Sequence, residues 1–433
     1  MSCWRPKIKS YYSNRVGRER SQPASHDDRP SLIGVFVRSS VAAAAVTTLY
    51  AAGYLGGLQR SWTDAWGRAF QPRPSSHVAL VAISEDDYQA PGLFGGTSPL
   101  NPATLQRLFE RLAQHRPAVV VVDILLQPSP HEPADRDKQR RELYATLSKV
   151  VVGAPTRWVL AAPSGEVETD DARVLAAWKE LQVVGGDQPD RLTFAVAQLD
   201  AEGGVVRRIA RCVDSGPAGM QMATLFGAAL AEGRSACANA AHRVAERIRY
   251  TGSYSNSGGA TGLGHRFTVS ELLDPPSPPQ GATILTGKTV VVGGTYHSSG
   301  DTHWTPIGTL YGAEVWAEGL DTAFRQDALD EIGWPVMLVL QTLVGFATGW
   351  LALRFQKTVG QVIAVVAFVA VTALCTTLSF GLGFVMISAL PAFFATQVNS
   401  SIDALPNLLG ELAQKRIEKR RRRPIPRRRK QTK

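Results

Sequence analysis

Charged side chains are almost absent from residues 335–402, where Arg354 and Lys357 are the only two. This absence argues against the ordinary amphipathic helices of a soluble protein, which expose a charged face to water. One deeply buried helical core is a weaker interpretation for the same reason. A membrane-spanning helix needs about 20 apolar residues. The pattern therefore predicts three transmembrane helices, over residues 335–353, 358–379 and 382–402, with a turn near Phe380–Phe384.

A fourth uncharged stretch, Ser39–Leu58, follows two arginines. A secretory signal peptide is the alternative interpretation, but the apolar region is long for one and no convincing cleavage site follows it. We therefore interpret residues 31–58 as a transmembrane helix that is not removed.

The net charge of +10 arises from the ends of the chain, whereas residues 59–334 hold more acidic than basic side chains. Basic flanking segments remain in the cytoplasm. With four spans, this rule places the polar arm of residues 1–30 and the tail of residues 403–433 inside, and residues 59–334 outside. The arm lacks apolar periodicity, so we expect it to be disordered.

Cysteine is scarce, with four in 433 residues. On this topology Cys3 is cytoplasmic and Cys375 lies in a span, whereas Cys212 and Cys237 share the oxidising side. A disulfide between these two is one interpretation. The other is that both are small buried apolar residues.

The middle of the chain alternates between strand-like and helix-like patterns, without an internal repeat. His77–Ile83 and Ala118–Leu126 are apolar runs typical of buried strands, and Pro102–His115 between them has apolar residues at helical spacing. This order predicts a parallel βαβ unit within a mixed α/β domain. Further strands are expected at Trp158–Ala162, Arg247–Thr251 and Lys288–Gly293. A hairpin is expected to join Leu192–Asp200 to Gly204–Cys212. Further helices are expected at Arg140–Lys149, Met220–Ala231 and Tyr311–Phe324.

Acidic side chains follow two of the predicted strands. Glu85 and Asp86 come after the first, and Asp123 ends the apolar part of the second. Open α/β sheets bind ligands beyond the carboxyl ends of their strands. These residues are therefore candidate ligand contacts. The alternative is that Asp123 caps or anchors the following loop.

Two other patterns carry less weight. His297, Asp301 and His303 lie on one loop and have side chains that can ligate a metal, but no second ligand cluster supports them, and a hydrogen-bonded loop is the default interpretation. Ala282–Thr289 looks like a phosphate-binding loop but leads into a predicted strand, whereas such loops precede a helix.

The segment Gly287–Phe324 resembles the closing part of the type-two CHASE (cyclase/histidine-kinase-associated sensory extracellular) domain. The shared features are Gly287-Lys288, a strand ending in Val292-Gly293, Thr295, Asp301, Thr305-Pro306 and the helix start Gly312-Ala313-Glu314-Val315-Trp316-Ala317. Asp301 and Thr305 of this motif join the candidate ligand residues. Trp316 departs from the pattern, because a His is common there.

Other segments extend the resemblance to roughly residues 70–325. They are the strand that contains Asp123, the hairpin Asp200–Arg208 and the strand Arg249–Gly252. One span before the domain and three after it is the family's usual arrangement. The resemblance implies an extracytoplasmic sensor of a bacterial inner-membrane receptor, and a homodimer.

Such receptors normally continue into an output domain, but the roughly 30 residues after the last predicted span are too few for one. We therefore expect the signal to pass to a cytoplasmic effector in trans. The tail has leucines at helical spacing before a basic run, which favours an amphipathic helix on the anionic inner leaflet over nucleic-acid binding. The predicted contacts are Lys415, Arg416, Lys419, Arg420, Arg421, Arg422 and Arg423.

No nucleophile–base pair or pair of catalytic acids follows from residue spacing, so we expect neither an enzyme nor a cofactor. An alternative function stays open. The chain could be a structural or regulatory docking subunit of a membrane complex, without a small-molecule ligand.

Overall fold

The computed structural model describes residues 56–127, 136–162, 172–186, 190–214, 221–230, 237, 245–255, 266–274 and 285–331, with scattered positions between 33 and 48 and between 335 and 385. The chain divides into two compact units. One of them, residues 49–337 with 371–390, contains all the helices and strands described below. In the other unit, the rings of Phe36 and Phe346 meet edge to face with centroids 5.8 Å apart.

The described residues include no helix long and apolar enough to cross a membrane. Most residues of the four predicted spans, together with the arm 1–30 and the tail 403–433, lie outside the described set.

A six-stranded sheet forms the centre of the domain, and all its neighbouring strands are parallel. The strand order is β11-β1-β12-β2-β3-β4. All six residues of β1 are buried, as expected of a parallel strand covered on both faces. The strands span Val78–Ile83 (β1), Val119–Asp123 (β2), Arg157–Ala162 (β3), Leu192–Val196 (β4), Arg266–Thr268 (β11) and Thr289–Gly294 (β12).

The predicted βαβ unit is confirmed, with one addition that the sequence did not indicate. Helix α4, Pro102–His115, has the predicted bounds; Asn101 caps its N-terminus and Arg116 ends it in the left-handed conformation, with φ of 50°. β1 and β2 run parallel, but β12 lies between them, pairing Leu80 with Val291 and Val291 with Val121. A strand formed some 170 residues after β2 is thus inserted into the unit.

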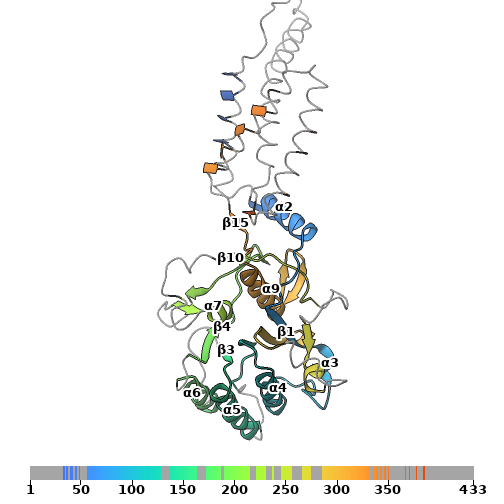
Figure 1. Cartoon of the computed structure of the whole chain (residues 1–433), viewed down its shortest axis with the longest axis vertical. Helices are drawn as coiled ribbons and strands as arrows, with labels where there is room; N and C mark the ends of the chain where they lie inside the picture. Colours follow the sequence, from blue (N-terminus) through green and yellow to red (C-terminus); the bar gives the residue numbers. More distant parts are fainter. Residues whose placement is uncertain are drawn as a thin grey trace, which may run out of the picture. The chain divides into compact units, whose positions relative to one another are not determined.

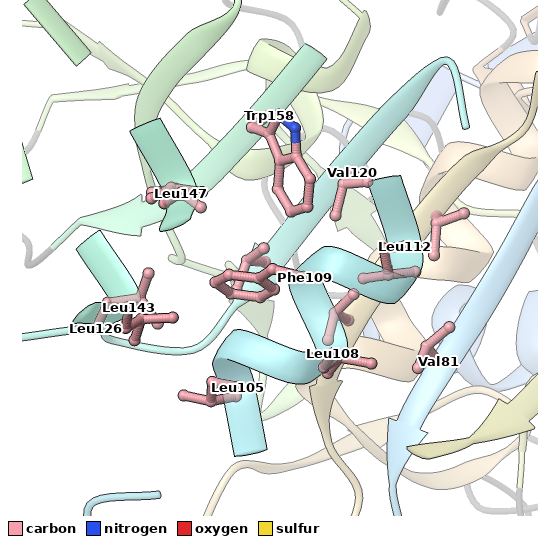
Figure 2. Close-up of a cluster of buried hydrophobic side chains, with 14 of the residues drawn as sticks. Val81, Leu105, Leu108, Phe109, Leu112, Val120, Leu126, Leu143, Leu147 and Trp158 are labelled. Carbon is pink, nitrogen blue, oxygen red and sulfur yellow. The ribbon is translucent and has the colours of Figure 1, made fainter. Parts of the chain in front are cut away.

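Helices cover both faces of the sheet (Figure 1). One face packs against α4, α5 (Arg136–Gly153), α6 (Ala172–Gly186) and α8 (Val269–Leu273), and the other against α7 (Leu225–Leu230) and α9 (Gly312–Arg325). Figure 2 shows the first core, in which Phe109 meets Trp158 edge to face with ring centroids 5.3 Å apart.

Smaller sheets lie beside the α9 face. β5 (Ala201–Glu202), β6 (Val205–Val206), β13 (Thr302–Thr305) and β14 (Gly308–Tyr311) form one sheet, in the order β14-β13-β6-β5. β7 (Arg208–Ile209) pairs with β10 (Glu246–Arg247), and β8 (Cys212–Asp214) pairs with β9 (Gln221–Ala223).

The predicted hairpin of Leu192–Asp200 with Gly204–Cys212 is wrong in its first strand. Leu192–Val196 is β4 and pairs with β3 in the main sheet, because its apolar side chains complete the core there. The predicted turn is present, since Gly203 and Gly204 adopt φ of 62° and 81° and join β5 to β6.

Two further boundaries differ from the predictions. The helix expected over Met220–Ala231 begins only at Leu225, because the preceding residues pair with β8. The strand expected over Arg247–Thr251 is limited to Glu246–Arg247, since the N–H of Thr251 binds the Glu318 carboxylate instead of a neighbouring strand. The helix at Tyr311–Phe324 and the strand at Lys288–Gly293 are confirmed as α9 and β12, each shifted by one residue.

Candidate functional site at the carboxyl edge of the sheet

Adjacent strands of the sheet lead to helices on opposite faces. β1 and β2 are followed by helices on the α4 face, whereas β12 between them is followed by α9 on the other face. Such a reversal marks the place where open α/β sheets bind ligands, beyond the carboxyl ends of the strands. The residues that follow β1, β12 and β2 therefore form the candidate site, which we call the carboxyl edge.

Asp123 ends β2 opposite Gly293 of β12. A Cβ atom at Gly293 would lie 2.5 Å from Ala313 Cβ and 3.2 Å from Asp123 Cβ, so glycine allows α9 to approach the sheet. Burial, and then the nearby Asp301 carboxylate, raise the pKa of Asp123 to about 8, and a hydrogen bond from Trp316 partly opposes them. This raised pKa favours the protonated form of Asp123 near neutral pH.

Asp301 lies against the N-terminus of α9. Its backbone oxygen accepts a hydrogen bond from Gly312 N at 3.0 Å. A Cβ at Gly312 would come within 1.9 Å of Asp301 Oδ2, so only glycine leaves room for the carboxylate. The positive end of the helix dipole favours a negative charge at this position. Asp301 and Asp123 thus both adjoin the first turn of α9.

Glu85 is joined to the loop after β12. Its Oε2 accepts from His297 N at 2.7 Å, and its Oε1 accepts from Gln89 Nε2 at 3.0 Å. The hydrogen bond from Gln89, and then that from His297, hold the pKa of Glu85 below its usual value. Although Glu85 is exposed, its orientation is therefore fixed.

Asp86 is exposed, and the next residue, Asp87, carries the structural role. The buried Asp87 carboxylate accepts from Ser84 N, Val269 N and Ser270 N at 3.0–3.1 Å, so it joins the end of β1 to α8. Sequence reasoning missed Asp87. The signal was its position three residues after Ser84, because a Ser followed by an acidic residue at this spacing is a helix N-terminal signature.

Arg266, Glu314 and Thr295 were also missed as site residues. Arg266 Nη1 lies 2.6 Å from Glu314 Oε1, and its Nη2 donates to Thr295 Oγ1 at 3.1 Å. Glu314 Oε2 accepts from Tyr311 N at 2.9 Å. Thr295 and Glu314 are positions of the CHASE-like motif, but their partner Arg266 lies in β11, which only the fold brings close.

Aromatic rings complete the carboxyl edge. Tyr88 and Tyr296 stack with centroids 4.1 Å apart. Burial, Tyr88 and then Glu85 raise the pKa of Tyr296 to about 12. The pKa of Tyr311 is raised by burial, then by Glu314 and Glu85. Carboxylates beside tyrosine rings can bind a cationic group, through charge and through the ring faces.

The remaining predicted site residues do not converge. Thr305 is buried and donates from Oγ1 to Gly308 O at 2.6 Å, so it closes the β13–β14 turn. His303 Nε2 lies 2.8 Å from Asp301 Oδ1, whereas His297 begins a separate 3-10 turn. Across the described part of the chain, no three His, Cys, Asp or Glu side chains are arranged to hold a metal ion. The basic residues 415–423 lie outside the described set.

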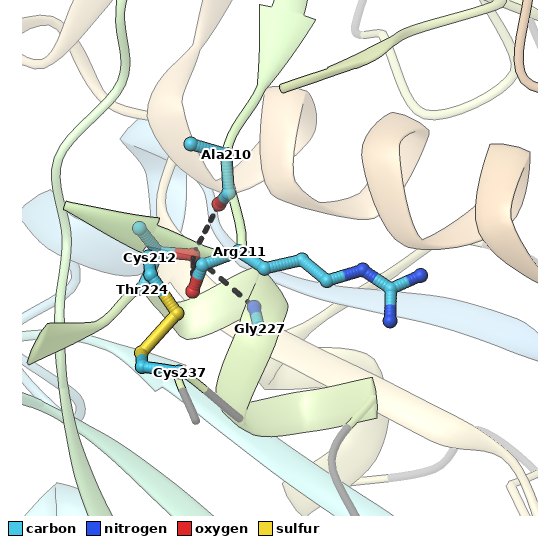
Figure 3. The surroundings of a disulfide bond; sticks show 6 residues. All are labelled: Ala210, Arg211, Cys212, Thr224, Gly227 and Cys237. Carbon is cyan, nitrogen blue, oxygen red and sulfur yellow. Dashed lines mark hydrogen bonds between the residues drawn. A yellow bond between two sulfur atoms is a disulfide. The ribbon is translucent and has the colours of Figure 1, made fainter. Parts of the chain in front are cut away.

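Cys212 and Cys237 form a disulfide with Cα atoms 5.8 Å apart (Figure 3). The bond lies near the start of α7 (Figure 3), where Thr224 pairs with Val196, the last residue of β4. There Thr224 Oγ1 donates to Ala210 O at 2.6 Å and accepts from Gly227 N at 3.1 Å. A Cβ at Gly227 would lie 2.0 Å from Arg211 O, so this close contact also requires glycine.

Comparison with known families supports the resemblance noted in the sequence. The family model of the CHASE2 domain matches residues 41–355. The chain belongs to the CHASE2 domain family. The CHASE2 domain is a sensory domain, typically of membrane-associated proteins, which makes this chain a signalling sensor. No curated protein matched the chain, and no solved structure did.

The raised pKa of Asp123 predicts how the stability of the CHASE2 domain depends on pH. The folded domain keeps this proton up to about pH 8, whereas the unfolded chain loses it near about pH 4. The folded state thus binds more protons in this interval, and the contribution of Asp123 to stability falls as the pH rises through it. We expect Asp123→Asn to raise the melting temperature more at about pH 8 than at about pH 5.

Melting curves of the full-length protein, recorded across this pH range, test the expectation. The matched control is Asp86→Asn, because Asp86 is exposed. An equal shift for Asp123→Asn at both pH values would contradict the assignment.

Proposed function

We propose that this protein is a bacterial inner-membrane receptor that binds an extracytoplasmic ligand at the carboxyl edge and transmits the event across the membrane. The observation that carries the proposal is the convergence of Glu85, Asp123, Asp301 and Arg266 around the first turn of α9, in a domain of the CHASE2 family. The protein has no catalytic activity of its own and no cofactor.

The chain crosses the membrane four times, with both termini in the cytoplasm. The uncharged runs and the basic flanking segments support this topology. The disulfide agrees with an oxidising compartment for the sensor domain. The protein acts as a homodimer on a cytoplasmic effector, and its basic tail contacts anionic lipid and that effector but not nucleic acid.

The ligand is a small molecule with a cationic or hydrogen-bond-donating group. Several carboxylates and three tyrosine rings adjoin the carboxyl edge, and Arg266 is already paired with Glu314. A group that replaces the hydrogen bonds of Glu85 or approaches the tyrosine faces would satisfy this chemistry.

Ligand binding is tested by thermal-shift screening of the full-length protein in nanodiscs against a library of amines, amino acids and neutral polyols. A ligand at about 100 times its Kd stabilises the folded state by about 2.7 kcal/mol. We expect at least one cationic compound to raise the melting temperature, and Glu85→Gln to abolish the shift.

Asp86→Asn is the matched control and should keep the full shift. If no compound stabilises the protein while a stable protein complex co-purifies, the docking-subunit function would replace this one.

The tail is tested by changing its seven basic residues between 415 and 423 to Gln. We expect a cytoplasmic protein that co-purifies with the wild type to be lost, because its contact depends on these charges. Changing Arg427, Arg428 and Arg429 to Gln is the control, since it removes charge from the same tail outside the proposed contact. Retention of the partner by the first variant would contradict the assignment.

A further inference from the structure

Helix α9 connects two distant parts of the domain. Its first turn adjoins Asp123 and Asp301 at the carboxyl edge, and its last residue, Arg325, leads to the segment by which the chain leaves the domain. Its 14 residues give a length of about 20 Å. A displacement of its first turn is therefore carried along a rigid element to its other end.

The second half of α9 is held by buried hydrogen bonds. Glu318 accepts from Thr251 N at 2.7 Å and from Gly252 N at 2.8 Å, and both Glu318 and Asp321 are fully buried. Arg325 Nη2 donates to Arg249 O at 2.8 Å. Because breaking such bonds leaves buried charge unpaired, α9 and residues 249–252 are expected to move together.

The same segment is joined to the helix at the start of the domain, α2 (Gly56–Ala69). Ile248 N donates to Arg207 O at 2.9 Å. The Arg207 side chain forms a two-point ion pair with Asp64 of α2, with distances of 3.0 Å and 2.6 Å. The side chain of Arg207 is only 7% exposed and that of Asp64 only 12%, so water screens their interaction little.

The chain leaves the domain beside α2. Asp327 lies 3.0 Å from Arg325 Nη1, and Leu329 packs against Trp66 of α2. Strand β15, Asp330–Glu331, then pairs in parallel with β16, Phe384–Val385, matching Glu331 with Val385. Phe384 belongs to the turn predicted near Phe380–Phe384, and both residues of β16 fall inside the predicted fourth span, 382–402. The prediction of a helix is therefore wrong at these two residues, because they pair with β15 as a strand.

We propose that these contacts form one coupling joint between the sensor and the membrane segments, made of the Asp64–Arg207 ion pair, the Trp66–Leu329 contact and the β15–β16 pair. The joint fastens α2, which continues from the end of the first predicted span, and β16, which lies at the start of the predicted fourth span, to the end of α9. Movement of α9 is thereby passed to several spans at once. The signalling role of this movement rests on the proposed function. The joint itself rests only on the contacts described above.

Cysteine cross-linking in native membranes tests the joint. The full-length protein would carry Glu331→Cys and Val385→Cys, with Cys3 and Cys375 changed to Ser. Paired strands bring Cα atoms to about 5 Å, which is within disulfide range. We expect rapid intramolecular cross-linking with copper phenanthroline, and little when Val385→Cys is combined with Glu110→Cys, because Glu110 is exposed on α4, on the opposite face of the sheet from α9. Equal cross-linking of both pairs would overturn the β15–β16 contact.

The connection to α2 is tested in the same cross-linking background. Asp64→Asn with Arg207→Met removes both charges of the ion pair, and we expect it to slow cross-linking at least about fivefold, the lower end of typical coupling between sites. Arg208→Met is the matched control, because its pair with Glu202 is more exposed. Arg207→Lys keeps the charge but loses the two-point geometry, and it should give an intermediate rate.

An unchanged rate in the double variant, at a melting temperature near that of the wild type, would overturn the coupling. The assay needs no ligand. A failed ligand screen would therefore leave the joint intact, and a failed cross-link would leave the sensing proposal intact.

Discussion

The structure depends on three carboxylates buried along one face of α9. Glu314, Glu318 and Asp321 follow each other at helical spacing, and each is almost fully buried. A buried carboxylate is stable only when donors surround it. Each of the three therefore fixes a different part of the chain against the helix.

Their partners come from segments far apart in the sequence. Glu314 binds Arg266 of β11, Glu318 binds the backbone at Thr251, and Asp321 accepts from Ser75 N at 2.8 Å. Burial raises the pKa of Glu318 to about 7, against the opposing effect of the hydrogen bonds from Thr251. Helix α9 thus contacts the edge of the sheet, the segment before β1 and the segment by which the chain leaves the domain.

This arrangement gives the sensing proposal a physical basis. A ligand changes a distant site only if it binds two conformations differently. The first turn of α9 meets the candidate site through Gly312 and Ala313, and its last turn meets the exit through Arg325. One rigid element therefore adjoins both the site where a ligand could bind two conformations differently and the exit of the domain, beyond which the membrane segments are predicted.

Local patterns in the sequence predicted a large part of the fold. The Asn101 cap, Pro102 and the spaced leucines specify α4 locally, and the short apolar, β-branched runs of β1 and β2 are typical of buried strands. The insertion of β12 between these strands was not predictable, because pairing between such uniform Val-rich strands leaves no local signal of order. Leu192–Val196 was misplaced for the same reason.

The candidate site was predicted where residues follow a strand and where the CHASE-like motif supplied Asp301. Glu85 and Asp123 were found because strand ends are visible in the sequence. Arg266 begins the three-residue strand β11, and nothing local in the sequence connects it with Glu314, 48 residues away. The partners of buried charges are long-range consequences of the fold, and spacing along the chain does not reveal them.

A change at the carboxyl edge should reach the exit of the domain through α9. Hydrogen–deuterium exchange on full-length Gly293→Ala tests it most directly, because the new Cβ would lie 2.5 Å from Ala313 Cβ and displace the first turn of α9. Gly92→Ala is the control, since its Cβ would meet nothing within 4 Å. We expect faster exchange at residues 326–331 and in α2 as well as near the substitution. Faster exchange confined to residues near 293 and 313 would contradict it.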